Sequence, residues 1–205
     1  YDSYPLMTQA MLLALDDLGA HPAPQEVYRQ LKVSVYHCCC QMAERYSFSP
    51  QTALAAFHRH HDPMTSFRLY PGARECLRTV CAAGGYNYLY THRNATALDC
   101  LRRDGLEALF TDRITKDDHF PDKPAPNAIR HLLCKHGVAG RLALMVGDRD
   151  IDLQAAENAG IDAVLFDPDG FYPNTPATHR ADSFRELTHL LITLAQGEKG
   201  NISTV

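Results

Sequence analysis

Apolar residues recur three and four positions apart through the first third of the chain. From Tyr4 to about His61 the spacing is that of Leu6, Ala10 and Leu13, which places apolar side chains on one face of a helix. No strand-like alternation is evident in this stretch. Prolines divide it at Pro22, Pro24, Pro50 and Pro63. The pattern predicts a small all-helical region of about four helices joined by short turns.

The pattern of apolar residues changes after Pro71-Gly72, where short apolar runs begin to alternate with helical segments. The pattern predicts helices over 73–83, after Asn94, and over 126–136, 152–159 and 183–195, and strands over 86–90, 113–115, 142–146 and 163–166. The apolar run from Leu142 to Val146 predicts a strand buried on both faces. Such alternation builds an α/β fold, a doubly wound parallel sheet flanked by helices. Residues 197–205 are expected to form a frayed tail.

Two domains follow from this change of pattern. Residues 1–3 would end a linker from the core, residues 4–66 would form the helical domain, and residues 67–205 the α/β domain. The composition, 45% hydrophobic and 21% charged, fits a packed globular protein. The net charge is −4 and the Lys and Arg residues are scattered, so we expect no nucleic-acid and no membrane partner. An anionic ligand must therefore be held by a local site.

The seven cysteines indicate the compartment. Their number is odd and no zinc-type pair of CxxC spacings occurs, so we expect a reducing, cytoplasmic environment. The run Cys38-Cys39-Cys40 is interpreted as helix packing, because successive helical residues point about 100° apart and cannot converge on one ion. No apolar stretch is long enough for a membrane span and no signal peptide is visible. We therefore expect a soluble protein.

Candidate ligand-binding residues follow the predicted strand 86–90. Ligands of open parallel sheets gather beyond the carboxyl ends of the strands, and here that position holds Thr91, His92, Arg93 and Asn94. A hydroxyl and free backbone N–H groups at the start of a helix suit phosphate oxygens. Thr91 or Asn94 could equally cap the helix, so both interpretations stay open here.

Three carboxylates, Asp148, Asp150 and Asp152, lie in the turn after the strand 142–146. Like charges so close repel one another, and a hard cation such as Mg²⁺ among them would make the arrangement tolerable. In that interpretation Asp148 is the direct ligand and Asp152 supports it. In the alternative, Asp150 or Asp152 caps the helix and Asp148 is a solvated loop residue.

A lysine completes the set of candidates. Lys123 lies in the segment Asp-Lys-Pro-Ala-Pro, where the prolines fix the approach to a helix. Its ammonium could pair with both a phosphate and a catalytic carboxylate. Lys116 is an alternative candidate for this role, but no prolines flank it in its loop.

With these motifs in this order, the sequence resembles the haloacid dehalogenase superfamily, in the phosphoglycolate-phosphatase-like branch with a helical cap inserted early in the chain. The segment 89–94 resembles the second family motif, 123–126 the third, and 146–152, continuing through Ala159-Gly160, the fourth. The resemblance implies a Rossmann-like core in which Thr91 and Lys123 grip the transferring phosphoryl group. It also implies that Asp148 and Asp152 hold Mg²⁺, and it makes His92, Arg93 and Asn94 candidate substrate contacts, Arg93 being equally a surface ion-pair partner.

The first family motif, a strand followed by Asp-x-Asp-Gly-Thr, is absent from the sequence. The resemblance implies that this strand lies between the strands that carry Thr91 and Asp148. Without it, two buried ladders of backbone groups would be unpaired. We therefore expect an upstream segment of about 10 to 20 residues that carries the nucleophile and the general acid. The alternative is that another chain donates the strand.

The function implied by the resemblance is a Mg²⁺-dependent phosphatase that hydrolyses a small phosphorylated metabolite through an aspartyl-phosphate, with the cap choosing the substrate. The alternatives are a non-catalytic relative that binds a phosphorylated ligand and a sugar-phosphate mutase on the same fold. A metal-free dehalogenase is disfavoured by the acid pair. The sequence does not select among phosphoglycolate, a sugar phosphate and a nucleotide monophosphate, and it does not indicate the oligomeric state.

Overall fold

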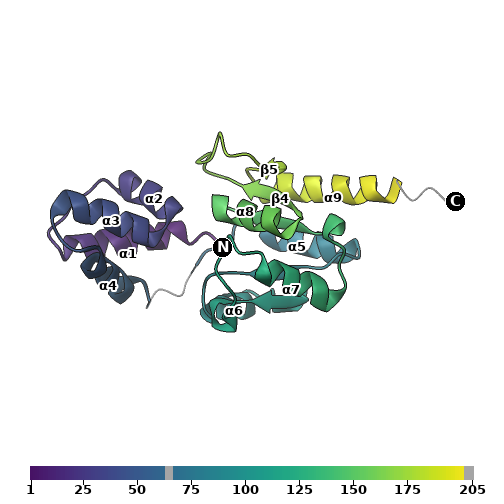
Figure 1. Ribbon diagram of the computed structural model, residues 1–205, viewed down its shortest axis with the longest axis horizontal. Coiled ribbons are helices and arrows are strands. Elements are labelled where there is room, and N and C mark those ends of the chain that lie inside the picture. Colours follow the sequence, from purple (N-terminus) through teal and green to yellow (C-terminus); the bar gives the residue numbers. More distant parts are fainter. Residues whose placement is uncertain (63–66, 201–205) are drawn as a thin grey trace. The chain divides into compact units, whose positions relative to one another are not determined.

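The computed structural model describes residues 1–62 and 67–200, with side chains described as far as Gln196. The chain forms two compact units, Tyr1–Tyr70 and Pro71–Val205 (Figure 1). The boundary expected between residues 66 and 67 stays a prediction, because residues 63–66 lie outside the described part.

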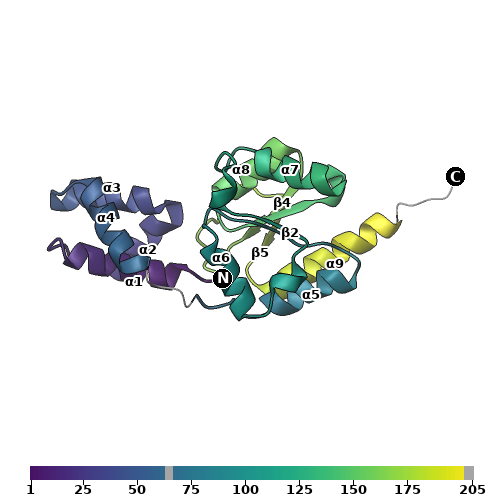
Figure 2. The ribbon, with the colours of Figure 1, turned by 90° about the horizontal axis from the view of Figure 1, so that it is seen from below.

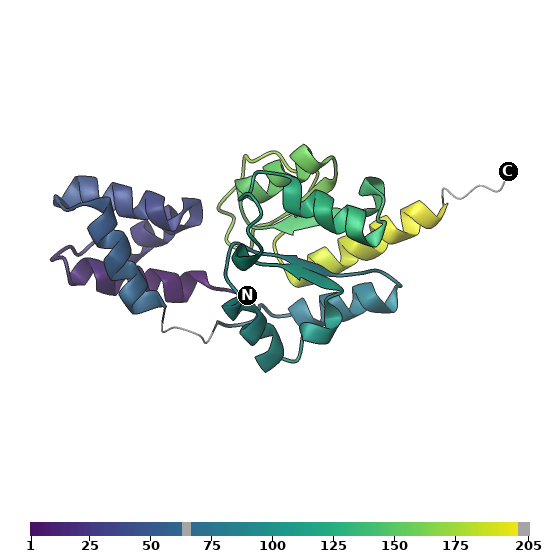
Figure 3. The same ribbon diagram turned by 60° about the horizontal axis from the view of Figure 1, so that its bottom comes forward.

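The first unit is helical, as the spacing of apolar residues predicted (Figure 3). Its helices are α1 (Tyr4–Asp16), α2 (Pro24–Val33), α3 (Val35–Tyr46) and α4 (Pro50–His61). Serine side chains cap two of them: Ser34 Oγ accepts the backbone N–H of His37 at 2.9 Å, and Ser49 Oγ accepts that of Thr52 at 3.0 Å. These bonds satisfy N–H groups that the first turn of a helix leaves without a helical partner.

The core of the helical unit explains the cysteine run. Cys38 and Cys39 of α3 are fully buried beside Phe57 of α4, whereas Cys40 is only half-buried. Cys38 and Cys39 therefore serve helix packing, as interpreted from the sequence. Across the described helices of both units, no segment combines the length and apolar character that a bilayer crossing requires.

The second unit alternates helices and strands, which confirms the predicted α/β class. Its elements are α5 (Ala73–Ala82), β1 (Tyr88–Tyr90), α6 (Thr96–Arg103), η1 (Glu107–Leu109), β2 (Asp112–Ile114), η2 (Lys116–Asp118), α7 (Asn127–His136), η3 (Gly140–Leu142), β3 (Leu144–Gly147), α8 (Asp150–Ala159), β4 (Asp162–Phe166), β5 (His179–Ala181) and α9 (Phe184–Gly200). Figure 2 shows α7 and α8 on one face of the strands and α5 and α9 on the other. This is the layering of a doubly wound fold.

All strand pairs in the described chain are parallel, and they form two sheets. In one, β1 pairs with β2, and in the other the order is β3-β4-β5. Within residues 1–62 and 67–200, β1 and β3 share no hydrogen-bonded ladder and no common neighbour. The carboxyl ends of these two strands carry the candidate site.

The expectation that the strand at 142–146 is buried on both faces is wrong for the described chain. Leu142 lies in η3 and is 56% exposed, and Val146 of β3 is 39% exposed. The reason is that β3 pairs only with β4 among the described residues. By contrast β4, which has a neighbour on each side, is buried from Ala163 to Phe166.

Other differences concern the ends of elements. Strand β1 begins at Tyr88 rather than residue 86, and Tyr86 is exposed. Strand β5 was not predicted from the sequence. Helix α9 continues to Gly200, so the tail expected from residue 197 is partly helical, and residues 201–205 lie outside the described chain.

Candidate active site

A buried ion pair joins two of the predicted site residues. Lys123 Nζ lies 2.6 Å from Asp152 Oδ1, and the two side chains are only 6% and 3% exposed. The same ammonium lies 3.5 Å from the carbonyl oxygen of Tyr90 and 4.5 Å from the centre of its ring. Charged groups at this depth are held in place by their partners. The end of β1, the loop before α7 and the first turn of α8 therefore meet at Lys123.

Asp152 lies in the first turn of α8 and packs tightly against the end of β3. Its second oxygen, Oδ2, accepts the backbone N–H of Arg149 at 3.1 Å, so it also performs the capping role considered from sequence. A Cβ atom on Gly147 would lie 2.1 Å from the Cβ of Asp152 and 2.8 Å from its Oδ2. Only glycine therefore allows the strand to approach this side chain.

Thr91 follows β1 directly and is half-buried. Its backbone N–H donates to the carbonyl of Ile114 at 3.0 Å, which continues the ladder with β2 past the strand end. The hydroxyl oxygen accepts the backbone N–H of Arg93 at 3.1 Å. Because this bond uses an oxygen lone pair, the hydroxyl proton can still be donated to an anion. Thr91 does not cap α6, whose N-cap is Ala95.

Asn94 has a local role. Its side chain is exposed, and Oδ1 accepts the backbone N–H of Thr96 at 3.2 Å and its hydroxyl at 2.6 Å. The amide thus organises the turn before α6 without being the N-cap of that helix, which is Ala95. Nothing in this geometry directs Asn94 toward Lys123.

His92 and Arg93 have different neighbours. His92 Nε2 accepts the backbone N–H of Lys123 at 3.0 Å. Burial, and after it the charge of Lys123, lowers the pKa of this imidazole below 6.5. Burial also lowers the pKa of the Arg93 guanidinium, and the thiol of Cys100 in α6 is its nearby electrostatic neighbour. His92 therefore joins the Lys123 loop, whereas Arg93 lies against α6.

Asp148 is half-buried in the loop between β3 and α8. A tyrosine that the sequence analysis missed belongs to the same neighbourhood: burial, and after it the negative charge of Asp148, raises the pKa of Tyr172 to about 12. Its loop is closed by Asp167, whose two oxygens accept the N–H groups of Phe171 at 2.8 Å and Tyr172 at 2.7 Å. A single tyrosine in a loop carries no sequence signal that distinguishes it from a packing residue.

Asp148 and Asp152 are the acidic residues that could bind magnesium. Among residues 1–62 and 67–200, no three His, Cys, Asp or Glu side chains are grouped closely enough to hold a metal ion. Mg²⁺ requires fewer protein ligands, since it keeps several waters and is bound through one or two carboxylates plus phosphate oxygens. Asp148 and Asp152 meet that smaller requirement in residue type.

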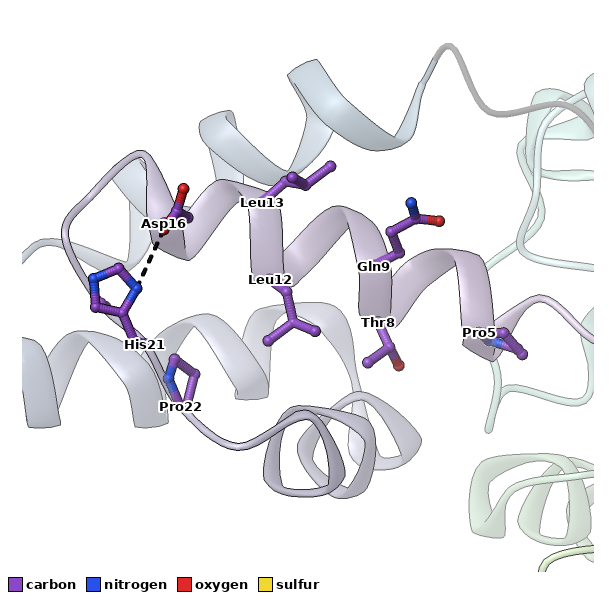
Figure 4. Close-up of a pocket in the computed structure, with 9 residues that line it drawn as sticks. Pro5, Thr8, Gln9, Leu12, Leu13, Asp16, His21 and Pro22 are labelled. Atoms are coloured by element: carbon purple, nitrogen blue, oxygen red, sulfur yellow. Dashed lines mark ion pairs between the residues drawn. The ribbon is translucent and has the colours of Figure 1, made fainter.

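The helical unit contains a separate surface cavity. A cavity of about 490 Å³ runs along α1 and the turn after it (Figure 4). Figure 4 shows Thr8 and Leu12 on one side of α1 and Gln9 and Leu13 on the other. Its titratable residues, Asp16 and His21, pair with each other at 3.2 Å and are 68% and 72% exposed. None of the predicted site residues lines this cavity. Asp16 and His21 are exposed to solvent, whereas Lys123 and Asp152 are buried.

Known proteins resemble this chain in sequence and in fold. A family model described as haloacid dehalogenase-like hydrolase matches residues 1–166. The phosphoglycolate phosphatase of Vibrio vulnificus is 37% identical over 94 residues, which are 45% of this chain and 41% of that protein. The chain thus matches less than half the length of this curated relative.

Solved structures resemble the chain over most of its length. A predicted phosphoglycolate phosphatase from Haemophilus somnus aligns with a TM-score of 0.77 at 19% identity, covering 92% of each chain. YfnB from Bacillus subtilis, solved bound to magnesium, aligns with a TM-score of 0.69 at 18% identity, covering 93% of each chain. At these identities the likeness establishes the fold alone.

Proposed function

Because the chain belongs to the family of haloacid dehalogenase-like hydrolases, we propose that the protein is a magnesium-dependent phosphatase acting on a small phosphate monoester. The observation that carries this proposal is the buried pair of Lys123 and Asp152 beside the carboxyl end of β1. An ammonium fixed there can offset the charge of a transferring phosphoryl group without having to reorganise. The likeness to phosphoglycolate phosphatases supports the substrate class.

Thr91 and Lys123 bind the phosphoryl group from two loops. The Thr91 hydroxyl has a proton to donate, and the Lys123 ammonium has a third donor beyond those directed at Asp152 and at the carbonyl of Tyr90. Charge-assisted hydrogen bonds of this kind are the stronger ones, and here they form away from bulk water. Together they orient phosphorus for in-line attack.

Asp148 is the residue that would contact Mg²⁺ directly. Both oxygens of Asp152 already accept hydrogen bonds, from Lys123 and from the Arg149 N–H, so we assign Asp152 to positioning the lysine and the loop. When bound, the ion would supply positive charge to the phosphoryl oxygens. The magnesium in the structure of YfnB supports this choice of metal.

We propose that the nucleophile comes from the Asp-x-Asp motif that the family resemblance implies. We propose that its strand pairs with the facing edges of β1 and β3, a place supported by the exposure of Val146 and the split between the sheets. The first Asp forms a bond to phosphorus as the ester P–O bond breaks, and the second gives the leaving oxygen a proton. That second Asp then deprotonates a water, which displaces the first Asp and releases phosphate.

Substrate selection falls to the helical unit in this proposal. The family resemblance implies that this unit is a cap that excludes water and chooses the substrate. Phosphoglycolate is the first substrate to test, because relatives bear that name.

The test is phosphate release by full-length protein that includes the upstream motif. Phosphoglycolate, a sugar phosphate and a nucleoside monophosphate are assayed with Mg²⁺ and with EDTA. We expect Mg²⁺-dependent turnover, lost about 100-fold or more in Lys123→Met and Asp148→Asn, and unchanged in His189→Gln, an exposed control on α9. If folded, metal-loaded protein hydrolyses none of these esters but is stabilised by them in a thermal shift, the non-catalytic binding function replaces this proposal.

A further inference from the structure

One hydrogen bond ties the loop after β1 to the loop that carries Lys123. The Lys123 backbone N–H donates to His92 Nε2 at 3.0 Å, between residues 31 positions apart. A backbone N–H can only donate, so Nε2 must be the unprotonated ring nitrogen. His92 is therefore neutral in this arrangement, with its proton on Nδ1.

We propose that neutral His92 is a positioning residue that holds Lys123 for phosphoryl transfer, and that protonation of His92 disables the site. The proposal rests on the phosphatase function above. Lys123 is anchored at two points, its backbone by His92 and its ammonium by Asp152. His92 acts through Lys123 rather than through a contact of its own with substrate, which differs from the substrate-binding role that the family resemblance implied.

The surroundings of His92 favour the neutral form. Burial is the largest effect that lowers its pKa, followed by the charge of Lys123, and Arg149 acts in the same direction. Asp122 and Asp152 oppose them. Asp122 Oδ1 lies 3.8 Å from Nε2, but its side chain is 73% exposed, so water weakens its attraction for a proton. The Tyr90 ring, edge-on with centroids 6.1 Å apart, adds no charge.

Protonation would change two interactions at once. Nε2 would become a donor facing the backbone N–H donor of Lys123, and the new positive charge would be opposed by the charge of Lys123. Both effects push the two loops apart. Since burial lowers the pKa of the folded imidazole from its ordinary value, the neutral form predominates at neutral pH and is lost as the pH falls through the lowered pKa. We therefore expect kcat to fall on the acid side.

The experiment compares two substitutions in full-length protein. His92→Gln keeps an acceptor near the place of Nε2 and cannot titrate, whereas His92→Phe keeps ring size and removes the acceptor. We expect kcat at pH 8 to fall about 5- to 100-fold in His92→Phe, the range for leaving a buried donor without its partner. His92→Gln should recover most of that loss and flatten the acid limb. His189→Gln, on exposed α9, should leave the profile unchanged.

An NMR readout separates this inference from the proposed function. Long-range ¹H–¹⁵N spectra of His92 in the full-length protein should show the Nδ1–H tautomer at pH 7.5 and protonation below pH 6.5. A charged or Nε2–H imidazole at pH 7.5 overturns the inference, as does an acid limb shared by wild type and His92→Gln. If the expected tautomer is present but no phosphate ester is turned over, the phosphatase proposal fails and the catalytic role of His92 fails with it.

Discussion

Replacing Gly147 by alanine tests whether the close approach of β3 to Asp152 organises the site. The added Cβ would lie 2.1 Å from the Cβ of Asp152, 2.6 Å from its Cγ and 2.8 Å from its Oδ2. The shortest of these contacts joins two Cβ atoms, so no change of side-chain rotamer relieves it. The backbone of β3 or of α8 must move.

The magnitude follows from what that movement disturbs. Overpacking a well-packed site costs about 1–3 kcal/mol, and loss of the hydrogen bond that caps the first turn of α8 costs about 1 kcal/mol. The displaced carboxylate also loses its contact with Lys123, with which it is almost fully buried. We expect Gly147→Ala to lower the free energy of unfolding by about 3 kcal/mol and to abolish turnover.

Urea denaturation of the full-length protein measures the effect. Gly140→Ala, just before the same strand, is the matched control, because its Cβ would meet only Gly160 O at 3.3 Å and Ile161 Cγ2 at 3.5 Å. We expect this control to stay within about 1 kcal/mol of wild type. The double variant Gly147→Ala/Asp152→Ala should not recover stability, since alanine keeps the clashing Cβ. A Gly147→Ala protein as stable as the control would refute the reasoning.

Two further predictions concern buried groups. Lys123→Met should lower the free energy of unfolding by about 3–5 kcal/mol, because it leaves the carboxylate of Asp152 buried and unpaired. Adding Asp152→Leu should restore part of that loss. If urea denaturation shows that the effects of the two substitutions on the free energy of unfolding simply add, the two residues are not a coupled pair. Burial raises the pKa of the Cys38 thiol to about 12 and that of Cys39 to about 11, so at pH 8 both should resist a thiol reagent in the folded protein while exposed Cys81 reacts. Labelling of Cys38 as fast as Cys81 would count against this account.

Elements with a repeating apolar pattern could be predicted from the sequence. Each helix of the first unit satisfies its own backbone hydrogen bonds, so the spacing of apolar residues, together with the prolines at the starts of α1, α2 and α4, was enough to find them. Strand β5 (His179–Ala181) could not be found in this way. It is three residues long, contains one apolar residue, and exists because β4 offers it a ladder. Short strands of this kind are determined by their neighbours rather than by their own composition.

The site was partly predictable for a geometric reason. Parallel strands bring their carboxyl ends to one edge, so residues that follow β1 and β3 could be expected to meet. Lys123, in the loop that follows β2 and η2, contacts Asp152, in the helix that follows β3. The rule does not say which neighbour each side chain contacts, which is why it could not distinguish His92, bonded to the lysine loop, from Asn94, bonded within its own turn.

The Lys123–Asp152 contact also shows what keeps the two sheets in register. Because β1 and β3 share no ladder in the described chain, backbone hydrogen bonds between strands do not align their ends. The alignment comes instead from α7 and α8, which lie side by side over one face of the sheets (Figure 2). Asn158 of α8 donates to the carbonyl of Pro124 at 3.0 Å, which fixes the residue next to Lys123. The helix layer and the buried ion pair thus hold the loops after β1 and β3 together without a strand ladder between them.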